Sequence, residues 1–390
     1  SPEEIKICDP ACGSGHILTY AFDLLYSIYE EQGYAAASIP TLILKNNLYG
    51  IELDSRAGQL SAFALTMKAF EKNRRFVHNI VQPNICVLEN IKFETHEIND
   101  YMNAVGRDLF THPFETTLKQ FEESDNFGSL IEPALMNVDD IRDILLKKDL
   151  STNIFLNSTH NRVLKILHQS DYLRQKYNVV VANPPYMGGK GMNVKMTSFL
   201  KDNYVDVKSD LFSAFMVRNT KLTVEKGQLG FMTPFVWMFL SSYEKLRNFL
   251  LNENTITSLV QLEYSGFAGA TVPICTFTLQ NNYKSNFKGA YIQLSDFKGA
   301  SNQSPKTIEA IKDLENCDWF YRVSSSDFKL IPGSPISYWI SNNIRNVFKS
   351  NLSLSNYASI GKGLDTGNNE KYLRLWWEVS NKNKNWIPCQ

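Results

Sequence analysis

The first 89 residues alternate between short apolar runs and longer amphipathic segments. Glu4–Cys8, Leu48–Leu53 and Asn84–Leu88 have the length and composition of buried strands. Between them, apolar residues recur at helical spacing from about Ser14 to Gln32 and from Ser55 to Glu71. This order of strand, turn, helix and strand predicts a doubly wound α/β fold with a mostly parallel sheet.

Residues 90–176 interrupt the alternation and are predicted to form a helical insertion. They carry few strand signals, and the stretches Ile141–Asp149 and Asn161–Tyr177 have helical spacing. There are fourteen acidic and six basic residues between positions 89 and 149. The insertion is therefore acidic, and a nucleic acid is expected to avoid it.

The sheet is expected to resume after the insertion. Strands are predicted at Asn178–Ala182, Gly227–Thr233, Thr255–Leu262, Val272–Gln280 and Ala290–Leu294, the last two as closing strands that fit antiparallel pairing. Beyond Ser295 the composition becomes polar, aromatic and rich in asparagine and serine. We therefore predict one domain from residues 1–89 and 177–295, the insertion at 90–176, and the start of a separate module at 296–390.

The net charge of the 390 residues is zero, so affinity for a polyanion must come from local patches. Residues 183–226 carry seven basic and four acidic residues, and residues 284–312 are also more basic than acidic, which indicates where a nucleic acid would bind. The six cysteines are scattered without metal-ligand spacing, so no metal site is expected. No apolar run has the length of a membrane span, and we expect a soluble, cytoplasmic protein. Because a strand begins close to Ser1 and the sequence stops at Gln390 without a terminating pattern, we expect part of a longer polypeptide.

A rigid turn follows the predicted strand Asn178–Ala182. In Asn183-Pro184-Pro185-Tyr186 the two prolines fix φ and hold the preceding residue extended. The side-chain oxygen of Asn183 and the carbonyl of Pro184 can then accept both protons of one planar amine, and Tyr186 offers a flat surface to an aromatic base. Such a grip favours a tetrahedral nitrogen whose lone pair can attack a methyl group. The alternative is an ordinary turn after a strand.

Residues 9–16, Asp-Pro-Ala-Cys-Gly-Ser-Gly-His, lie where the first predicted strand turns into a helix. Glycines let a ligand approach the backbone, and the helix N-terminus offers unpaired N–H groups. The acidic Asp9 argues against a phosphate and for a cationic amino group, as in the methionine end of S-adenosylmethionine. The alternative is a plain turn between a strand and a helix. Glu52 ends the second strand, where it can accept hydrogen bonds from ribose hydroxyls. Glu89, after the third strand, is a candidate for the cofactor's adenine amine or for the target base, and a solvated carboxylate explains it equally well.

These motifs, in this order, resemble those of class I amino-methyltransferases and, more narrowly, of DNA adenine-N6 methyltransferases. Four segments are similar to the PglX methyltransferases of BREX phage-defence systems: Val181–Met192, Asp210–Phe215, Phe267–Pro273 and Gly361–Asn369. The resemblance covers residues 5–380 apart from the acidic insertion. It implies an α/β sheet of the seven-stranded methyltransferase type, direct methyl transfer to a flipped adenine, and a C-terminal recognition module. Members of this family also carry sequence upstream of the cofactor loop and a large recognition region downstream.

The resemblance also implies roles for individual residues. Asn183, Pro184, Pro185 and Tyr186 would hold the flipped adenine, with Phe267 as a second aromatic residue near the base. S-adenosylmethionine would be bound by Asp9, Ala11, Gly13, Gly15, His16, Glu52, Leu53 and Glu89. The segment Met187–Lys195 is expected to be flexible enough to close over DNA. Its residues Lys190 and Lys195 are expected near phosphates of double-stranded DNA, although ordinary surface lysines explain them nearly as well. Other proteins of the defence system are expected as partners, and a membrane is not.

Two other functions stay open at this point. One is N-methylation of a protein glutamine or an RNA guanine, whose amines are chemically similar to that of adenine. The other is a non-catalytic DNA-binding or scaffold subunit that keeps the fold. The long insertion and the trailing module favour DNA methylation.

Overall fold

The computed structural model describes residues 1–109, 111–264, 266, 272–350, 352, 356–358, 367–375 and 377–379. The chain divides into two compact units, Ser1–Ile340 and Ser341–Gln390. The first unit contains the sheet and the sites discussed below. In the second unit the described residues include the helices α14 (Asn342–Ser350) and α15 (Asn369–Tyr372).

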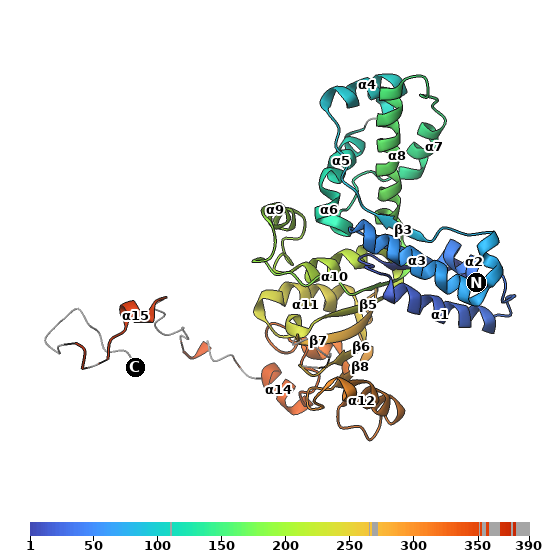
Figure 1. Ribbon diagram of the computed structural model, residues 1–390. Helices are drawn as coiled ribbons and strands as arrows, with labels where there is room; N and C mark the ends of the chain where they lie inside the picture. Colours follow the sequence, from blue (N-terminus) through green and yellow to red (C-terminus); the bar gives the residue numbers. More distant parts are fainter. Residues whose placement is uncertain are drawn as a thin grey trace. The chain divides into compact units, whose positions relative to one another are not determined.

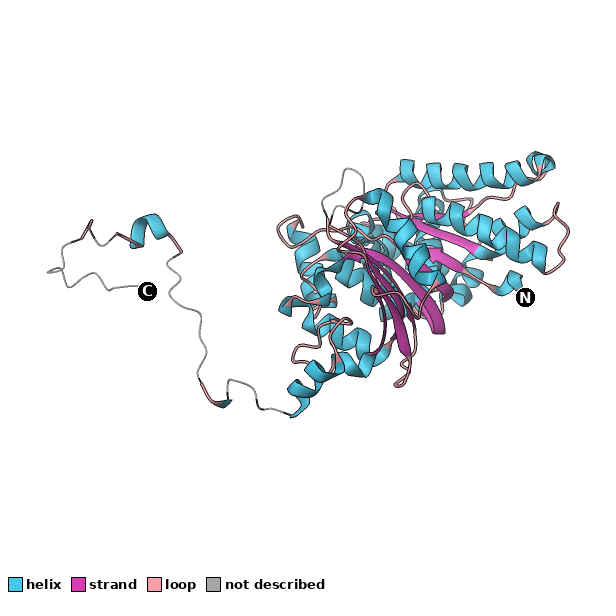
Figure 2. Ribbon diagram, turned by 90° about the horizontal axis from the view of Figure 1, so that it is seen from below, coloured by secondary structure: helices cyan, strands magenta, loops and turns pink. Residues whose placement is uncertain are grey.

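A nine-stranded sheet runs through the first unit in the order β3-β2-β1-β4-β5-β7-β6-β8-β9 (Figures 1 and 2). The strands are β1 (Ile7–Asp9), β2 (Leu48–Glu52), β3 (Asn84–Val87), β4 (Tyr177–Ala182), β5 (Thr223–Pro234), β6 (Thr255–Gln261), β7 (Ile274–Gln280), β8 (Lys288–Gln293) and β9 (Phe320–Ser324). From β3 to β5 all neighbours pair in parallel, whereas β7 is antiparallel to both β5 and β6. β8 is parallel to β6 and antiparallel to β9. The predicted doubly wound, mostly parallel sheet is confirmed.

Helices cover both sides of the sheet (Figure 2). The helices of the first unit are α1 (His16–Glu31), α2 (Ile39–Leu42), α3 (Ser55–Lys72), α4 (Thr95–Val105), α5 (His112–Gln120), α6 (Ser124–Phe127), α7 (Val138–Leu146), α8 (Ile154–Arg174), α9 (Val194–Asn203), α10 (Leu211–Leu222), α11 (Glu244–Glu253), α12 (Ala300–Lys312) and α13 (Ser325–Phe328). Ile7 and Val179 pack with α1 and α3 in one apolar cluster. The next residues, Cys8 and Val180, pack with the insertion and the end of α10 in another. Successive strand residues point to opposite sides, so each side of the sheet has its own core.

The predicted helical insertion is built from α4 to α8, between β3 and β4. Figure 1 shows these helices beyond the β3 end of the sheet, with α8 running back to it. α8 begins after Asn153, whose side chain accepts hydrogen bonds from the N–H groups of Phe155 and Leu156. Its residues Val163 and Ile166 are buried in the same cluster as Cys8. The insertion is therefore packed onto the sheet.

Several elements differ from the sequence expectation. β1 starts at Ile7, because Pro2–Glu4 forms a 3-10 turn capped by the hydroxyl of Ser1. β9 was not predicted, because a run of five residues gives only a weak strand pattern. Its pairing partner β8 also lies 27 residues or more upstream, so no hairpin marks the pair. α9 and α12 occupy stretches where no helix was expected.

The division of the chain also differs from the predicted module boundary. β9 extends the sheet, and the hydroxyl of the buried Tyr338 donates a hydrogen bond to Gln261 Oε1 at 2.7 Å. Residues 296–340 therefore belong to the first compact unit, and the break falls at Ser341 rather than after Ser295. No helix in the described part of the chain is long and apolar enough to cross a membrane.

Candidate active site

The carboxyl ends of three neighbouring parallel strands meet at one edge of the sheet. β1 ends with Asp9, β2 ends with Glu52, and β4 is followed directly by Asn183. Ligands of α/β proteins bind beyond the carboxyl ends of the strands. The topology thus brings together the two motifs that are 174 positions apart in the sequence.

The loop after β1 is held by Glu52. Its Oε2 accepts a hydrogen bond from the N–H of Gly13 at 2.7 Å, and its Oε1 accepts from the N–H of Leu53 at 2.9 Å and of Asp54 at 3.1 Å. A carboxylate offers about four acceptor positions, of which these N–H groups use three, so Glu52 can still accept a hydrogen bond from a ligand through Oε2.

Gly15 is required where the loop enters α1. Its φ is +84°, and a Cβ atom at this position would lie 2.5 Å from Ser61 Oγ on α3. The loop therefore packs closely against α3, which a larger residue would prevent. His16, at the first position of α1, is exposed.

The Asp9 carboxyl is 1% exposed and accepts a hydrogen bond from the N–H of Ala11 at 3.1 Å. Burial is the main reason that its pKa is raised to about 7, and the nearby Glu52 carboxylate also contributes to this increase. A cationic ligand at the loop would favour the ionised form of this carboxyl.

The Asn183-Pro-Pro-Tyr turn is braced by its surroundings. The single proton of the Tyr186 hydroxyl is shared between two acceptors, Asn183 Oδ1 at 2.7 Å and the carbonyl of Met232 at 3.0 Å. Burial raises the pKa of this phenol to about 12, so it remains a donor. The ring of Tyr186 meets that of Phe212 edge-on, with centroids 6.4 Å apart.

Asp210, at the N-cap of α10, fixes the residues that follow the turn. Its Oδ1 accepts hydrogen bonds from the N–H of Met187 at 3.0 Å and of Phe212 at 3.3 Å, and Leu211 N–H donates to the Met187 carbonyl. The turn is thus attached to the start of α10.

A cavity of about 320 Å³ connects the two motifs. Ala11, Glu52 and Leu53 line it from the loop side, and Asn183 and Pro185 line it from the turn. Nine other predicted site residues are described but are not among its lining: Asp9, Gly13, Gly15, His16, Glu89, Pro184, Tyr186, Lys190 and Lys195. Phe267 lies outside the described residues.

Two of the predicted charged residues have partners within the protein. Glu89 is half exposed and forms an ion pair with Lys165 of α8, with 2.5 Å between Oε2 and Nζ. Lys195 lies in α9, which begins at Val194 within the segment expected to be flexible, and its Nζ is 2.6 Å from Glu123 Oε1 in the insertion. Lys190 is exposed in a turn. No three histidine, cysteine or carboxylate side chains cluster as metal ligands within the described residues.

The sequence did not predict the part of the insertion that reaches the cavity. Asn126, Phe127, Gly128, Ser129 and Leu130 line it beside the loop and the turn. They lie within the acidic stretch of the insertion. The short run Phe-Gly-Ser-Leu is the one sequence feature that could have marked them as part of a site.

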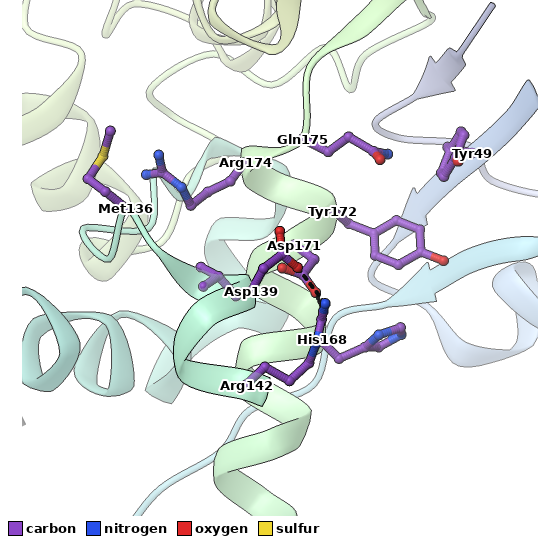
Figure 3. Close-up of a pocket in the computed structure, with 10 residues that line it drawn as sticks. Tyr49, Met136, Asp139, Arg142, His168, Asp171, Tyr172, Arg174 and Gln175 are labelled. Atoms are coloured by element: carbon purple, nitrogen blue, oxygen red, sulfur yellow. Dashed lines mark hydrogen bonds and ion pairs between the residues drawn. The ribbon is translucent and has the colours of Figure 1, made fainter. Parts of the chain in front are cut away.

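A second cavity of about 510 Å³ lies on the insertion side of β2, at the start of the strand (Figure 3). Tyr49, His168 and Tyr172 are among its lining residues. Arg142 forms ion pairs with Asp139 and Asp171. Both carboxylates also line the cavity, so they neutralise the positive charge of the arginine there. No predicted site residue lines this cavity, and it lies at the opposite end of β2 from Glu52.

The sheet order, the antiparallel β7 and the two motifs at the carboxyl edge define a class I methyltransferase fold. Residues 46–267 match the model of the Eco57I restriction-modification methylase family. Since the match spans more than half of the chain, this chain belongs to that family.

Relatives support the same assignment. The chain is 36% identical to the adenine-specific methyltransferase BrxX of Escherichia coli O9:H4 (strain HS), over 99% of this chain and 34% of BrxX. It is 33% identical to the adenine-specific methyltransferase PglX of Lacticaseibacillus casei (strain Zhang), over 97% of this chain and 32% of PglX. The predicted resemblance is thereby confirmed, and the chain spans about a third of the length of these relatives.

A solved structure has the same fold. It is a nuclease-deletion mutant of the Type ISP restriction-modification enzyme LlaGI in complex with a DNA substrate mimic, which aligns with a TM-score of 0.52 at 14% identity, over 88% of this chain and 25% of that one.

Proposed function

We propose that this chain is the cofactor-binding and catalytic part of a DNA adenine-N6 methyltransferase that uses S-adenosylmethionine. The observation that carries the proposal is the single cavity lined by Glu52 and Leu53 on one side and by Asn183 and Pro185 on the other. A methyl donor and an acceptor amine must share one such space. The adenine specificity named for BrxX and PglX supports adenine as the acceptor.

The residues around the cavity fit the proposed cofactor. Its volume lies in the range of small-molecule sites, which is roughly 300–1,000 Å³. Glu52, which lines the cavity, would accept a hydrogen bond from a ribose hydroxyl. Asp9 and the start of α1 are not among the lining residues, but Asp9 adjoins Pro10 and Ala11, which are, and they would hold the charged methionine end. When bound, S-adenosylmethionine supplies a methyl group activated by its positive sulfur.

The residues of the turn would hold the acceptor amine. Asn183 Oδ1 already accepts the proton of the Tyr186 hydroxyl, and a carbonyl oxygen has a second lone pair for an amine proton. The Pro184 carbonyl would accept the other amine proton. The nitrogen would then be held with its lone pair free, and no protein nucleophile is needed. The flipped base would stack on Tyr186, which offsets part of the unstacking free energy.

Double-stranded DNA is the proposed partner. Basic residues of the 183–226 segment, Lys190 and Lys195 among them, would contact its phosphates. For Lys195 this requires release from Glu123.

Transfer of tritiated methyl groups to unmethylated DNA tests the proposal. Wild-type protein should label adenine N6, and Asn183→Ala should lower the rate by about 10²–10³-fold, as expected when an acceptor for the reacting group is lost. Label on RNA or protein instead of DNA would refute adenine in DNA as the substrate. Binding of DNA without any binding of S-adenosylmethionine would favour a scaffold.

A further inference from the structure

We infer that Asn126–Leu130 of the insertion, here called the insertion wall, forms the side of the cofactor pocket that contacts the adenosine half, and that Arg218 positions this wall through Ser129. The inference rests on the proposed use of S-adenosylmethionine. It gives the insertion a function in cofactor binding, although its sequence contains no nucleotide-binding motif.

The insertion wall lines the same cavity as the ends of β2 and β3. It shares the cavity with Glu52, Leu53 and Leu88, which follow or end these two strands. Gly128 has φ +58°, and a Cβ atom there would lie 3.1 Å from Leu53 Cδ2. Gly128 of the wall therefore packs directly against Leu53, the residue that follows β2. If Glu52 binds the ribose, the attached purine would lie beside this contact, in the part of the cavity lined by Leu88 and Phe127.

Phe127 gives the wall a flat apolar surface. Phe127 lines the cavity, and its ring is stacked on Phe199 of α9 with 4.2 Å between centroids and 10° between planes. Phe199 does not line the cavity. A ring supported in this way keeps its orientation, which suits contact with a purine.

Ser129 joins the wall to the loop after β1. Its hydroxyl donates a hydrogen bond to the Pro10 carbonyl at 2.6 Å, and both groups are buried. Pro10 and Ala11 line the same cavity. The position of the wall relative to the loop is therefore set by this hydrogen bond.

Arg218 of α10 holds the wall from behind. Its Nε donates to the Ser129 carbonyl at 2.9 Å, and its Nη2 donates to the carbonyls of Ile131 at 3.0 Å and Leu173 at 2.6 Å. The side chain is 3% exposed, and burial lowers its pKa. Burying a guanidinium costs free energy unless its N–H groups are hydrogen-bonded. Those of Arg218 donate to three backbone carbonyls, which indicates that this side chain positions the segments that carry them.

The same helix serves both halves of the cavity. α10 starts next to Asp210, which braces the Asn183 turn, and carries Arg218 two turns later. The proposed acceptor site and the insertion wall are thus fixed to one rigid element.

Calorimetric titration of S-adenosylmethionine and of S-adenosylhomocysteine tests the inference. Ser129→Ala removes one hydroxyl and should weaken both ligands by about 3–10-fold, the effect of one hydrogen bond. Phe127→Leu and Arg218→Met should weaken them at least as much. In Ser129→Ala the affinity for a DNA duplex, measured without cofactor, should stay within about twofold of the wild type, because the lost hydroxyl donates to the Pro10 carbonyl and not to a residue proposed to contact DNA.

Matched variants separate positioning from general destabilisation. Thr223→Val removes a buried hydroxyl that donates to the Asn219 carbonyl at 2.8 Å, away from the cavity. Arg247→Met removes a second buried arginine that donates to the carbonyls of Trp237, Leu240 and Gly333. Neither control should change cofactor affinity, and melting temperatures show whether each variant is folded.

The outcomes are distinct. Wild-type affinity in folded Ser129→Ala and Phe127→Leu, together with lost affinity in Glu52→Ala, would overturn the insertion wall and leave the proposed function standing. Equal losses in the control variants would also overturn it. A wild-type protein that binds neither ligand would overturn the proposed function, and the inference with it.

Discussion

The hydroxyl of Tyr186 donates a hydrogen bond to the side-chain oxygen of Asn183 across 2.7 Å. The residue proposed to stack on the base is thus bonded to the residue proposed to grip its amine. This bond fixes the Asn183 carboxamide with its oxygen toward Tyr186 and occupies one of the two lone pairs of that oxygen.

Tyr186→Phe should therefore separate the two functions of the tyrosine. The variant keeps the aromatic surface and frees Asn183 Oδ1, so kcat/KM for DNA methylation should stay within about fivefold of the wild type. Tyr186→Ala removes the stacking surface and should lose about 10–100-fold, given ~1–3 kcal/mol for each stacked base. Equal losses in both variants would contradict a stacking role.

Asp9→Asn should alter stability and cofactor affinity in opposite directions. The pKa of Asp9 is raised to about 7 in the folded protein, above the value of about 3.9 in an unfolded chain. The folded state therefore favours the protonated carboxyl, whose contribution to stability is complete below pH ~4 and is lost as the pH rises through 7. Asp9→Asn should gain about 1–3 kcal/mol of stability at pH 8 and little at pH 4, as measured by urea unfolding.

Cofactor binding should show the opposite dependence. A cationic amino group prefers ionised Asp9, so wild-type affinity for S-adenosylmethionine should fall as the pH drops from 8 to 6. Asp9→Asn should bind weakly at every pH. A pH-independent wild-type affinity would contradict contact between Asp9 and the amino group.

Gly15→Ala should disrupt the loop more than Gly33→Ala does. Both glycines have positive φ, +84° and +78°, so each substitution costs about 1–2 kcal/mol of backbone strain. A Cβ atom would meet Ser61 only at position 15, since nothing lies within 4 Å at position 33. Gly15→Ala should therefore lose cofactor affinity in calorimetry as well as stability, and Gly33→Ala should lose only stability. Unchanged cofactor affinity in Gly15→Ala would speak against the loop as a binding element.

Lys195 should exchange Glu123 for a DNA phosphate. Glu123→Gln releases the lysine and should tighten DNA binding at low salt, whereas Lys195→Gln should weaken it and reduce the salt slope by ~1. The exposed pair of Lys245 and Asp206 provides the control, and Lys245→Gln should leave the slope unchanged. If Lys195→Gln and Lys245→Gln behave alike, Lys195 does not contact the DNA.

The parts of this protein that follow from local sequence were predictable. Strand ends at Asp9, Glu52 and Ala182, and the loops that follow them, are marked by apolar runs and by glycine and proline. Parallel pairing then brings the loops to one edge, which the alternation of strands and helices already implied.

What could not be predicted depends on contacts between distant segments. Ser129 is 119 positions from Pro10, and Arg218 is 89 positions from Ser129, so no local pattern marks their hydrogen bonds. Lys195 was expected in a flexible segment near DNA phosphates, but Asn193 caps α9 and Glu123 pairs with the lysine. The contribution of the insertion to the cavity arises only in the folded chain.

The most direct test of the proposed function is the product formed on unmethylated DNA. After incubation with S-adenosylmethionine, the DNA is digested to nucleosides and analysed by mass spectrometry, with Asn183→Ala as the control. The proposal predicts N6-methyladenine with wild-type protein and at least about 100-fold less with the variant. Methylated cytosine in place of N6-methyladenine, or equal amounts of N6-methyladenine from both proteins, would contradict it.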